Sequence, residues 1–219
     1  MPEAPERTFE TVRLDIELRG ALERAVALLL DGEAIAFPTD TVYGIGVCAF
    51  HAGAVERLYT LKGRPFYLPI PLLLPDVAAM SSACVDIPPI AWKLAARFWP
   101  GALSLVLRRA STVPDVVTSG GETVAVRVPD HSRVRELCRA LAAPLAATSA
   151  NQHGEPPPCT AEGVNRAFEG RIPLILAGGT CGGGMASTVL DLTVEPPVIL
   201  RQGPVSARQL AEVGGLWGD

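Results

Sequence analysis

With 219 residues, the chain can hold one large domain or two small ones. Its hydrophobic content of 48% is enough for a sizeable core, which excludes disorder over most of the length. A formal net charge of −4 and only 5% aromatic residues argue against binding nucleic acid through a broad basic surface or a stacking platform. A local cationic pocket remains compatible with this composition.

The predicted elements alternate between helices and strands along the chain. Helical spacing of apolar residues, with glycine or proline at the ends, predicts helices over residues 19–31, 52–63, 88–101, 132–143, 160–170 and 205–215. Apolar or alternating runs predict strands over residues 33–37, 69–74, 103–108, 123–128, 144–148, 173–176, 187–193 and 197–201. Because several strands follow one another directly, we expect an α/β fold with a mixed sheet in one domain. The prolines of 69–74 indicate an edge strand or a bulge.

The cysteines and the N-terminal segment indicate the cellular compartment. The cysteines are odd in number, widely spaced and without a C-x-x-C pair. This pattern predicts free thiols buried as small hydrophobes in a reducing compartment, not a zinc site or a disulfide framework. The N-terminal segment is charged and lacks a signal peptide, and no apolar run approaches the ~20 residues of a membrane span. We therefore expect a cytoplasmic protein. The cysteines are Cys48, Cys84, Cys138, Cys159 and Cys181.

Polar residues follow the predicted strand 33–37, in the segment PTDTVYGIG. Asp40 and Thr41 are expected to cap or brace this loop, whereas Tyr43 either braces it or faces a ligand. The stretch GIGVCA, which begins at Gly44, fits the pattern G-x-G-x-x-A. It lacks the acidic residue that should end a second strand about 20 residues later, so we reject a dinucleotide site.

Two cations stand one residue apart in LKGRP, directly after the predicted helix 52–63. Pro65 restrains the backbone of Arg64 toward an extended form, so Lys62 and Arg64 make a stiff pair suited to binding phosphate. The alternative is a pair of solvated charges at a helix C-terminus, where cations are favoured in any case.

Further polar groups lie within or just after the later strands. Arg127 interrupts an apolar strand, where it either binds an anion or simply faces solvent. Ser149 and Asn151 follow another strand, as ligand contacts or as ordinary turn residues. Arg201 ends the last strand, with the same alternative of a solvated charge. The glycine-rich segment 177–186 lacks the G-K-[ST] of a Walker loop.

The signatures of familiar hydrolytic enzymes are absent from the sequence. There are only three histidines, with no H-E-x-x-H pair, and no G-x-S-x-G nucleophile elbow. The remaining polar inventory is mainly threonine, serine, asparagine, lysine and arginine, which bind and polarise ligands. This inventory favours an enzyme that positions anionic substrates and supplies no nucleophile of its own.

Seven segments carry a resemblance to a known family: AFPTDTVYGIG, LKGRP, FWPGALSLVL, TVAVRVPDH, PLAATSANQHGEPP, STVLDLT and VILRQGP. In this order and spacing they resemble the YrdC-like threonylcarbamoyl-AMP synthases in their short, single-domain form. The resemblance covers residues 13–213 and leaves 1–12 as an N-terminal extension and 214–219 as a C-terminal tail. It implies a YrdC-like twisted mixed sheet with flanking helices around a large cationic cavity.

The family's activity is that of a nucleotidyltransferase. The resemblance implies that L-threonine, hydrogencarbonate and ATP, accompanied by Mg²⁺, yield L-threonylcarbamoyladenylate and pyrophosphate, with no metal site in the protein. The product would serve the N6-threonylcarbamoyladenosine modification at position 37 of tRNAs reading ANN codons, through a separate transfer complex and with no membrane partner. One alternative is a non-catalytic RNA-binding or ribosome-associated YrdC-like module, which needs an exposed basic face. Another is a related carbamoyl-adenylate-forming enzyme, although such enzymes are longer chains with extra domains.

The resemblance also assigns roles to individual residues. Lys62 and Arg64 are the expected catalytic cations. Leu68 and Leu73 depart from the family pattern, which commonly has asparagine and histidine there, so Leu73 is expected to offer only apolar contact to the threonine methyl group. The expected threonine-binding residues are Thr39, Arg127, Ala147, Ser187 and Leu73. The expected ATP-binding residues are Lys62, Arg64, Leu68, Thr123, Ser149, Asn151, Pro157 and Arg201.

Overall fold

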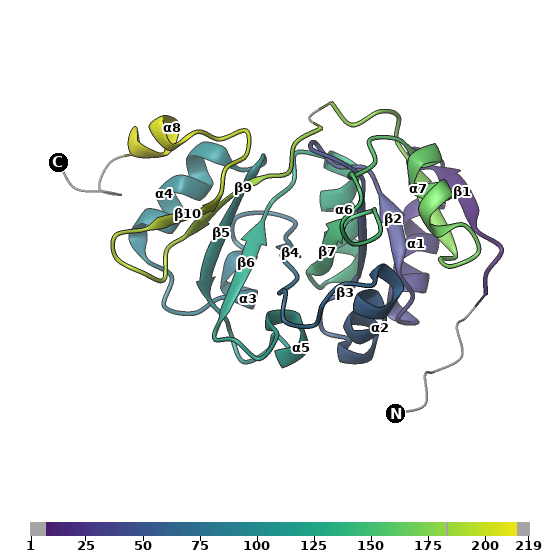
Figure 1. The fold of residues 1–219 in the computed structure, drawn as a ribbon, viewed down its shortest axis with the longest axis horizontal. Coiled ribbons are helices and arrows are strands. Elements are labelled where there is room, and N and C mark those ends of the chain that lie inside the picture. Colours follow the sequence, from purple (N-terminus) through teal and green to yellow (C-terminus); the bar gives the residue numbers. More distant parts are fainter. Residues whose placement is uncertain (1–7, 183, 214–219) are drawn as a thin grey trace.

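One ten-stranded sheet runs through the computed structural model, which describes residues 8–182 and 184–213 (Figure 1). The strands are β1 (Val12–Asp15), β2 (Ile35–Phe37), β3 (Gly44–Cys48), β4 (Leu72–Leu73), β5 (Leu103–Arg108), β6 (Thr123–Arg127), β7 (Leu145–Ser149), β8 (Leu174–Ala177), β9 (Thr188–Asp191) and β10 (Val198–Arg201). The helices are α1 (Ala21–Leu30), α2 (Ala52–Lys62), α3 (Met80–Ala83), α4 (Pro89–Phe98), α5 (Asp115–Thr118), α6 (Ser132–Leu141), α7 (Ala161–Phe168) and α8 (Ala207–Ala211).

The strand order confirms the predicted mixed sheet. Along the sheet the order is β1-β8-β2-β3-β7-β4-β6-β5-β9-β10, so β1 and β10 lie at opposite ends (Figure 1). Four neighbouring pairs are parallel, namely β1 with β8, β2 with β8, β4 with β6 and β5 with β9. The other five are antiparallel. The predicted α/β class is therefore correct.

Each face of the sheet has its own apolar cluster. On one face, Ala36, Ile45 and Leu72 pack with residues of α2, α4 and α7. On the other face, Phe37 and Leu73 pack with residues of α1 and α6. Since side chains alternate between the faces of a strand, neighbours such as Leu72 and Leu73 join different clusters. The two clusters fix the register of the central strands.

No strand was predicted over residues 44–48, and that omission is wrong, because this segment forms β3 between β2 and β7. A side chain is excluded at two of its positions. A Cβ atom on Gly44 would lie 2.9 Å from Cε2 of Phe37, and one on Gly46 would lie 3.0 Å from the Ala146 carbonyl oxygen. The two glycines thus allow close packing within the sheet. β1 and the short helices α3 and α5 were also not predicted.

The prediction that residues 69–74 form an edge strand is wrong as well. β4 is only two residues long and lies between β7 and β6, in the interior of the sheet. Its prolines precede the paired residues, so the missing N–H groups interrupt no ladder. The Pro71 carbonyl accepts a hydrogen bond from Ala147 N at 3.0 Å, which continues the pairing with β7 through an acceptor.

The ends of the chain lie partly beyond the described residues. The expected tail 214–219, residues 1–7 and the last two residues of the predicted helix 205–215 fall outside them. Phe9 N donates to the Gly170 carbonyl at 2.8 Å, and the Thr11 hydroxyl donates to the Ile172 carbonyl at 2.7 Å. In the described part of the chain no helix has the length and apolar character needed to cross a membrane.

All five cysteines are free thiols, and Cys159 is the one that is not fully buried.

Candidate active site

The register of the strands gathers several predicted site residues on one face of the sheet. Directly paired residues share a face, as do residues two apart on a strand. Leu73 pairs with Arg127 on one side and with Leu145 on the other. The same alternation, carried through β5, β9 and β10, brings Arg201 to this face. The predicted residues on this face are Leu73, Thr123, Arg127, Ala147, Ser149 and Arg201.

Helices α1 and α6 cover one part of this face. Leu73 is only 6% exposed and belongs to the cluster that packs against α1 and α6, together with Ala147. The Leu73 side chain is thus a core residue in this structure. Toward β10 the same face is more open: Thr123 is half-buried and Arg201 is exposed. Thr123 lies four residues from Arg127 on β6, or about 13 Å along the strand, so the two contact a common ligand only if it is extended.

Lys62 ends α2, where Gly63 takes a left-handed conformation with φ 59° that stops the helix. The ammonium group is buried and donates to two carbonyls, that of Ser149 at the end of β7 and that of Asn151 just beyond it, the latter at 2.7 Å. Burial, the larger cause, and the positive charge of Arg64 together lower the pKa of Lys62 to about 7. The site therefore holds a lysine that loses its proton far more readily than a solvated one.

Arg64 is oriented by main-chain carbonyls of the segment that follows it. Its Nε donates to the Leu68 carbonyl at 3.1 Å and its Nη2 to the Pro69 carbonyl at 2.8 Å. The Tyr59 hydroxyl donates to the same Leu68 carbonyl at 2.9 Å. Leu68, predicted to bind ATP, thus contributes its carbonyl to the placement of Arg64. Burial lowers the pKa of Arg64, while Tyr59 acts in the opposite direction.

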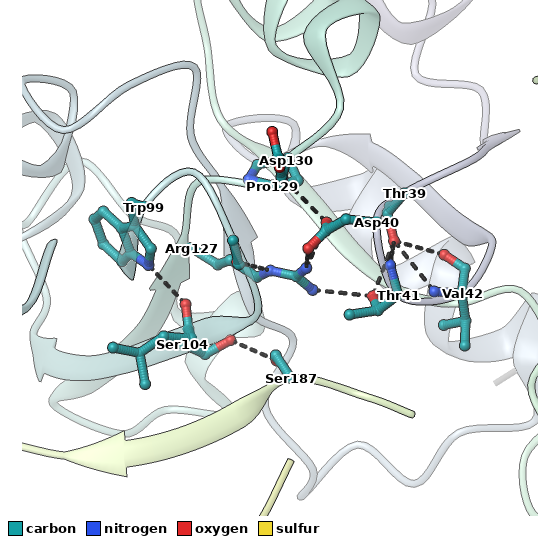
Figure 2. Close-up of polar contacts among 12 residues, drawn as sticks. Thr39, Asp40, Thr41, Val42, Trp99, Ser104, Arg127, Pro129, Asp130 and Ser187 are labelled. Carbon is teal, nitrogen blue, oxygen red and sulfur yellow. Dashed lines mark hydrogen bonds and ion pairs between the residues drawn. The ribbon is translucent and has the colours of Figure 1, made fainter. Parts of the chain in front are cut away.

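Arg201 is held in the same manner by Ser187. Its Nε and Nη2 donate to the Ser187 carbonyl at 3.0 and 2.8 Å, and Nη2 also donates to the Ser187 hydroxyl at 3.2 Å. That hydroxyl lies 2.8 Å from the hydroxyl of Ser104 on β5, a residue that we did not predict (Figure 2). A serine inside the apolar run LSLVLR was the available signal.

The cations of these separate elements form one electropositive cluster. Burial lowers the pKa of Arg201, and the charges of Arg127 and Arg64 lower it further, so the Arg201 guanidinium is close enough to both of the other two to be repelled by them. Within residues 8–182 and 184–213, no ion pair joins Lys62, Arg64 or Arg201 to a carboxylate. Such a cluster attracts a polyanion.

Arg127 differs from the other cations because it has a carboxylate partner. The alternative that it faces solvent is wrong, since it is only 6% exposed and forms an ion pair with Asp40 (Figure 2). The predicted bracing of the loop by Asp40 is confirmed by this contact. The Thr39 hydroxyl, predicted to bind threonine, donates to the Val42 carbonyl at 2.7 Å and so closes a turn in this structure.

The loop after β7 lines an open groove of about 430 Å³ against α7. Asn151 and Pro157, both predicted to bind ATP, line this groove together with Thr160 and Arg166. The Asn151 amide nitrogen donates to carbonyls of its own loop, whereas its Oδ1 is buried without a partner among the described residues.

Tyr43 links the first loop to the glycine-rich loop, 136 residues further along the chain. Its hydroxyl donates to the Gly179 carbonyl at 2.9 Å and accepts from Gly178 N at 3.0 Å. Of the two roles left open for Tyr43, the bracing role is the one that the structure contains. Gly178 and Gly179 are thus held against the loop that carries Thr39 and Tyr43.

The fold and this cluster define an α/β protein with a candidate anion-binding site built from cations at loop and strand ends. The comparisons identify the family. A family model for Sua5, YciO and YrdC, described as "Telomere recombination", matches residues 27–203. The chain belongs to this Sua5/YciO/YrdC family.

Two curated relatives illustrate the similarity. The threonylcarbamoyl-AMP synthase of Pyrococcus abyssi is 41% identical over 87% of this chain, which spans 56% of that protein's length. The chain thus spans little more than half of this longer relative. A putative threonylcarbamoyl-AMP synthase of Mycobacterium tuberculosis is 36% identical over 95% of both chains.

Two solved structures share the fold. The crystal structure of P. abyssi Sua5 complexed with L-threonine has a TM-score of 0.89 and 40% identity, and the match covers 96% of this chain and 62% of that one. Escherichia coli YciO has a TM-score of 0.81 and 25% identity, covering 93% of this chain and 99% of that one.

Proposed function

We propose that this protein is an L-threonylcarbamoyladenylate synthase, which forms threonylcarbamoyl-AMP and pyrophosphate from L-threonine, hydrogencarbonate and ATP. The observation that carries the proposal is the cluster of Lys62, Arg64 and Arg201, three cations without a carboxylate partner among the described residues. The proposal is supported by the relatives named threonylcarbamoyl-AMP synthase. The threonine-bound structure of P. abyssi Sua5 supports L-threonine as the amino acid.

The proposed reaction requires the protein to hold its substrates close together and to neutralise their negative charge. The amine of L-threonine takes up CO₂ from hydrogencarbonate to give a carbamate, with loss of water. A carbamate oxygen then attacks the α-phosphorus of ATP, and pyrophosphate leaves with the electrons of the broken P–O bond. No protein nucleophile takes part, so the rate enhancement comes from positioning and from stabilising charge on the phosphoryl oxygens.

In this proposal individual side chains bind different parts of the substrates. Lys62 and Arg64 bind the phosphates, since their carbonyl partners hold one side of each group and leave other N–H donors unused among the described residues. Arg201, whose Nη1 has no partner among the described residues, binds the phosphates in this proposal. Asn151 and Pro157 face the nucleotide from the groove beside α7.

We expect Mg²⁺ to accompany ATP, where it would neutralise phosphate charge. Among residues 8–182 and 184–213, no group of three or more histidine, cysteine, aspartate or glutamate residues could hold a metal ion. In this proposal the ion arrives with the nucleotide and takes its ligands from phosphate oxygens and water. The product is passed, in the same proposal, to a separate complex that modifies tRNA.

The rival reading as an RNA-binding module requires cations spread over an exposed face. Lys62 and Arg127 are 2% and 6% exposed, and Arg201 experiences the charges of Arg127 and Arg64. Buried cations that converge suit a small polyanion better than an RNA surface. The net charge of −4 also argues against binding to an RNA surface.

Pyrophosphate release from ATP tests the proposal. The purified protein is assayed with L-threonine and hydrogencarbonate together and with each omitted in turn. We expect pyrophosphate release only when both are present. We expect none when L-serine, which lacks the methyl group of threonine, replaces L-threonine at a concentration at which L-threonine saturates the enzyme. Turnover that is indifferent to threonine contradicts the proposal.

A further inference from the structure

The ion pair between Asp40 and Arg127 lies at the centre of the contacts in Figure 2. Arg127 Nη2 donates to both carboxylate oxygens of Asp40 at 2.6 Å. The side chains are 17% and 8% exposed, so the pair is largely shielded from water. Charge-assisted hydrogen bonds of this length in such surroundings hold a guanidinium in one orientation.

Each guanidinium nitrogen of Arg127 has its own partner. Nε donates to the Gly101 carbonyl at 2.8 Å and Nη1 to the Thr41 hydroxyl at 3.2 Å. The Asp40 carboxylate also accepts a hydrogen bond at Oδ1 from the backbone N–H of Asp130, at 3.1 Å. The pair therefore joins three loops: the one after β2, the one before β5 and the one after β6.

A chain of hydroxyl groups extends from Arg127 to the first loop. The Thr39 hydroxyl has one hydrogen, which it donates to the Val42 carbonyl. In the contact of 2.9 Å between the two threonine hydroxyls, Thr41 is thus the donor. Thr41 in turn accepts from Arg127. The orientation of Arg127 and the conformation of the Thr39 loop are therefore set together.

Asp40 also determines the charge of this part of the site. Burial lowers the pKa of Arg127, and Asp40 raises it through its charge and its hydrogen bonds. Since Lys62, Arg64 and Arg201 have no such partner in the described part of the chain, Arg127 is the cation that is both compensated and fixed. A fixed guanidinium recognises a carboxylate by its orientation as well as by its charge.

We propose that Asp40 is a positioning residue for the amino-acid substrate, acting through Arg127. Asp40 holds the guanidinium, and with it the Thr41–Thr39 hydroxyl chain, in the arrangement that receives the carboxylate of L-threonine. The phosphate-binding cations Lys62 and Arg64 are held by separate main-chain carbonyls, so Asp40 acts on the amino acid and not on ATP. This inference rests on the proposed function.

The test is the separation of the two Michaelis constants in Asp40→Asn, measured by pyrophosphate release. We expect the KM for L-threonine to rise at least tenfold while the KM for ATP stays within twofold of wild type. Asp130→Asn is the matched control, because the Asp130 side chain is exposed and pairs with Arg135 and not with Arg127. It removes an equal charge nearby and should change neither constant.

A second variant covers the case in which Asp40→Asn does not fold. Thr41→Val keeps the ion pair and the shape of the side chain but removes the acceptor for Nη1 of Arg127. We expect a rise of about threefold or more in the KM for L-threonine at an unchanged KM for ATP. A wild-type KM for L-threonine in this variant overturns the proposed role of the network.

The outcomes separate the inference from the proposed function. If wild-type turnover does not require L-threonine, the proposed function fails, and the inference fails with it. If wild type requires L-threonine but Asp40→Asn keeps its KM, only the positioning role fails. A loss of kcat with both Michaelis constants unchanged would assign Asp40 a purely structural role, which also overturns the inference.

Discussion

Binding of ATP should be accompanied by uptake of a proton on Lys62. Burial, with a smaller contribution from the charge of Arg64, lowers the pKa of this ammonium group to about 7 in the ligand-free protein. At pH 8 only about one tenth of the Lys62 side chains then carry a charge. A triphosphate beside the group favours the charged form, so its pKa rises in the complex and a proton is bound from solution.

The size of the proton uptake and of the change in ATP affinity follows from the pKa of Lys62. Nearly complete charging in the complex corresponds to uptake of about 0.9 proton per ATP at pH 8. Because the neutral form must first gain a proton, the affinity for ATP should fall as pH rises above about 7 and approach a tenfold loss per pH unit, or about 1.4 kcal/mol. Below pH 7 the group is already charged, so the affinity should level off.

Isothermal titration calorimetry in buffers of different ionisation enthalpy measures this uptake directly. The titration is made at pH 8 with Mg²⁺, where the phosphates of the nucleotide remain ionised. Lys62→Met is the control, because it keeps an unbranched chain but has no group to protonate. An ATP affinity that is independent of pH between 7 and 9, without proton uptake, would refute the reasoning. Uptake that persists in Lys62→Met would assign the proton to another group.

Three substitutions test the placement of other residues. Arg64→Ala should weaken ATP binding by ~1.5–3 kcal/mol, about 10- to 150-fold in Kd by calorimetry, whereas Arg208→Ala on the exposed surface of α8 should not. Gly203→Ala places a Cβ atom 2.5 Å from the Ala186 carbonyl oxygen and should lower the free energy of unfolding by about 1–3 kcal/mol in urea titrations. Leu73→Ala should cost about 2–5 kcal/mol in the same assay, because the side chain is buried. An unchanged midpoint in either titration contradicts the packing described for that residue.

The elements that were predicted well are those whose signal lies within the segment itself. The run 103–108 is β5, and residues 52–63 differ from α2 by one residue. β3 was missed because its glycines are typical of a turn. The reason for the glycines is the ring of Phe37 on the neighbouring strand, and this contact is not visible in the local sequence.

The interior position of β4 could not be predicted for a related reason. Proline marks edge strands because it lacks an N–H group, but Pro69 and Pro71 stand before the two paired residues and contribute acceptors instead. A strand of two residues carries too little pattern to show its neighbours. Its place between β7 and β6 follows from the packing of the whole sheet.

The sequence pointed to the cations of the site but not to what holds them. Lys62 and Arg64 were singled out as a pair, yet their partners are main-chain carbonyls, which every residue has. Likewise Asp40 and Arg127 are 87 residues apart, and only the fold selects one acid among many for that arginine. The substrate-binding roles assigned to Thr39, Leu73 and Thr123 stay predictions.

The measurement that tests the central claim most directly is the mass of the adenylate formed with ¹³C-labelled hydrogencarbonate. The purified protein is incubated with ATP, Mg²⁺ and L-threonine, and the product is analysed by mass spectrometry. The proposed chemistry predicts threonylcarbamoyl-AMP that retains the labelled carbon, at one mass unit above the unlabelled product. An adenylate of threonine itself, without the added carbonyl, or no adenylate at all, would contradict the account.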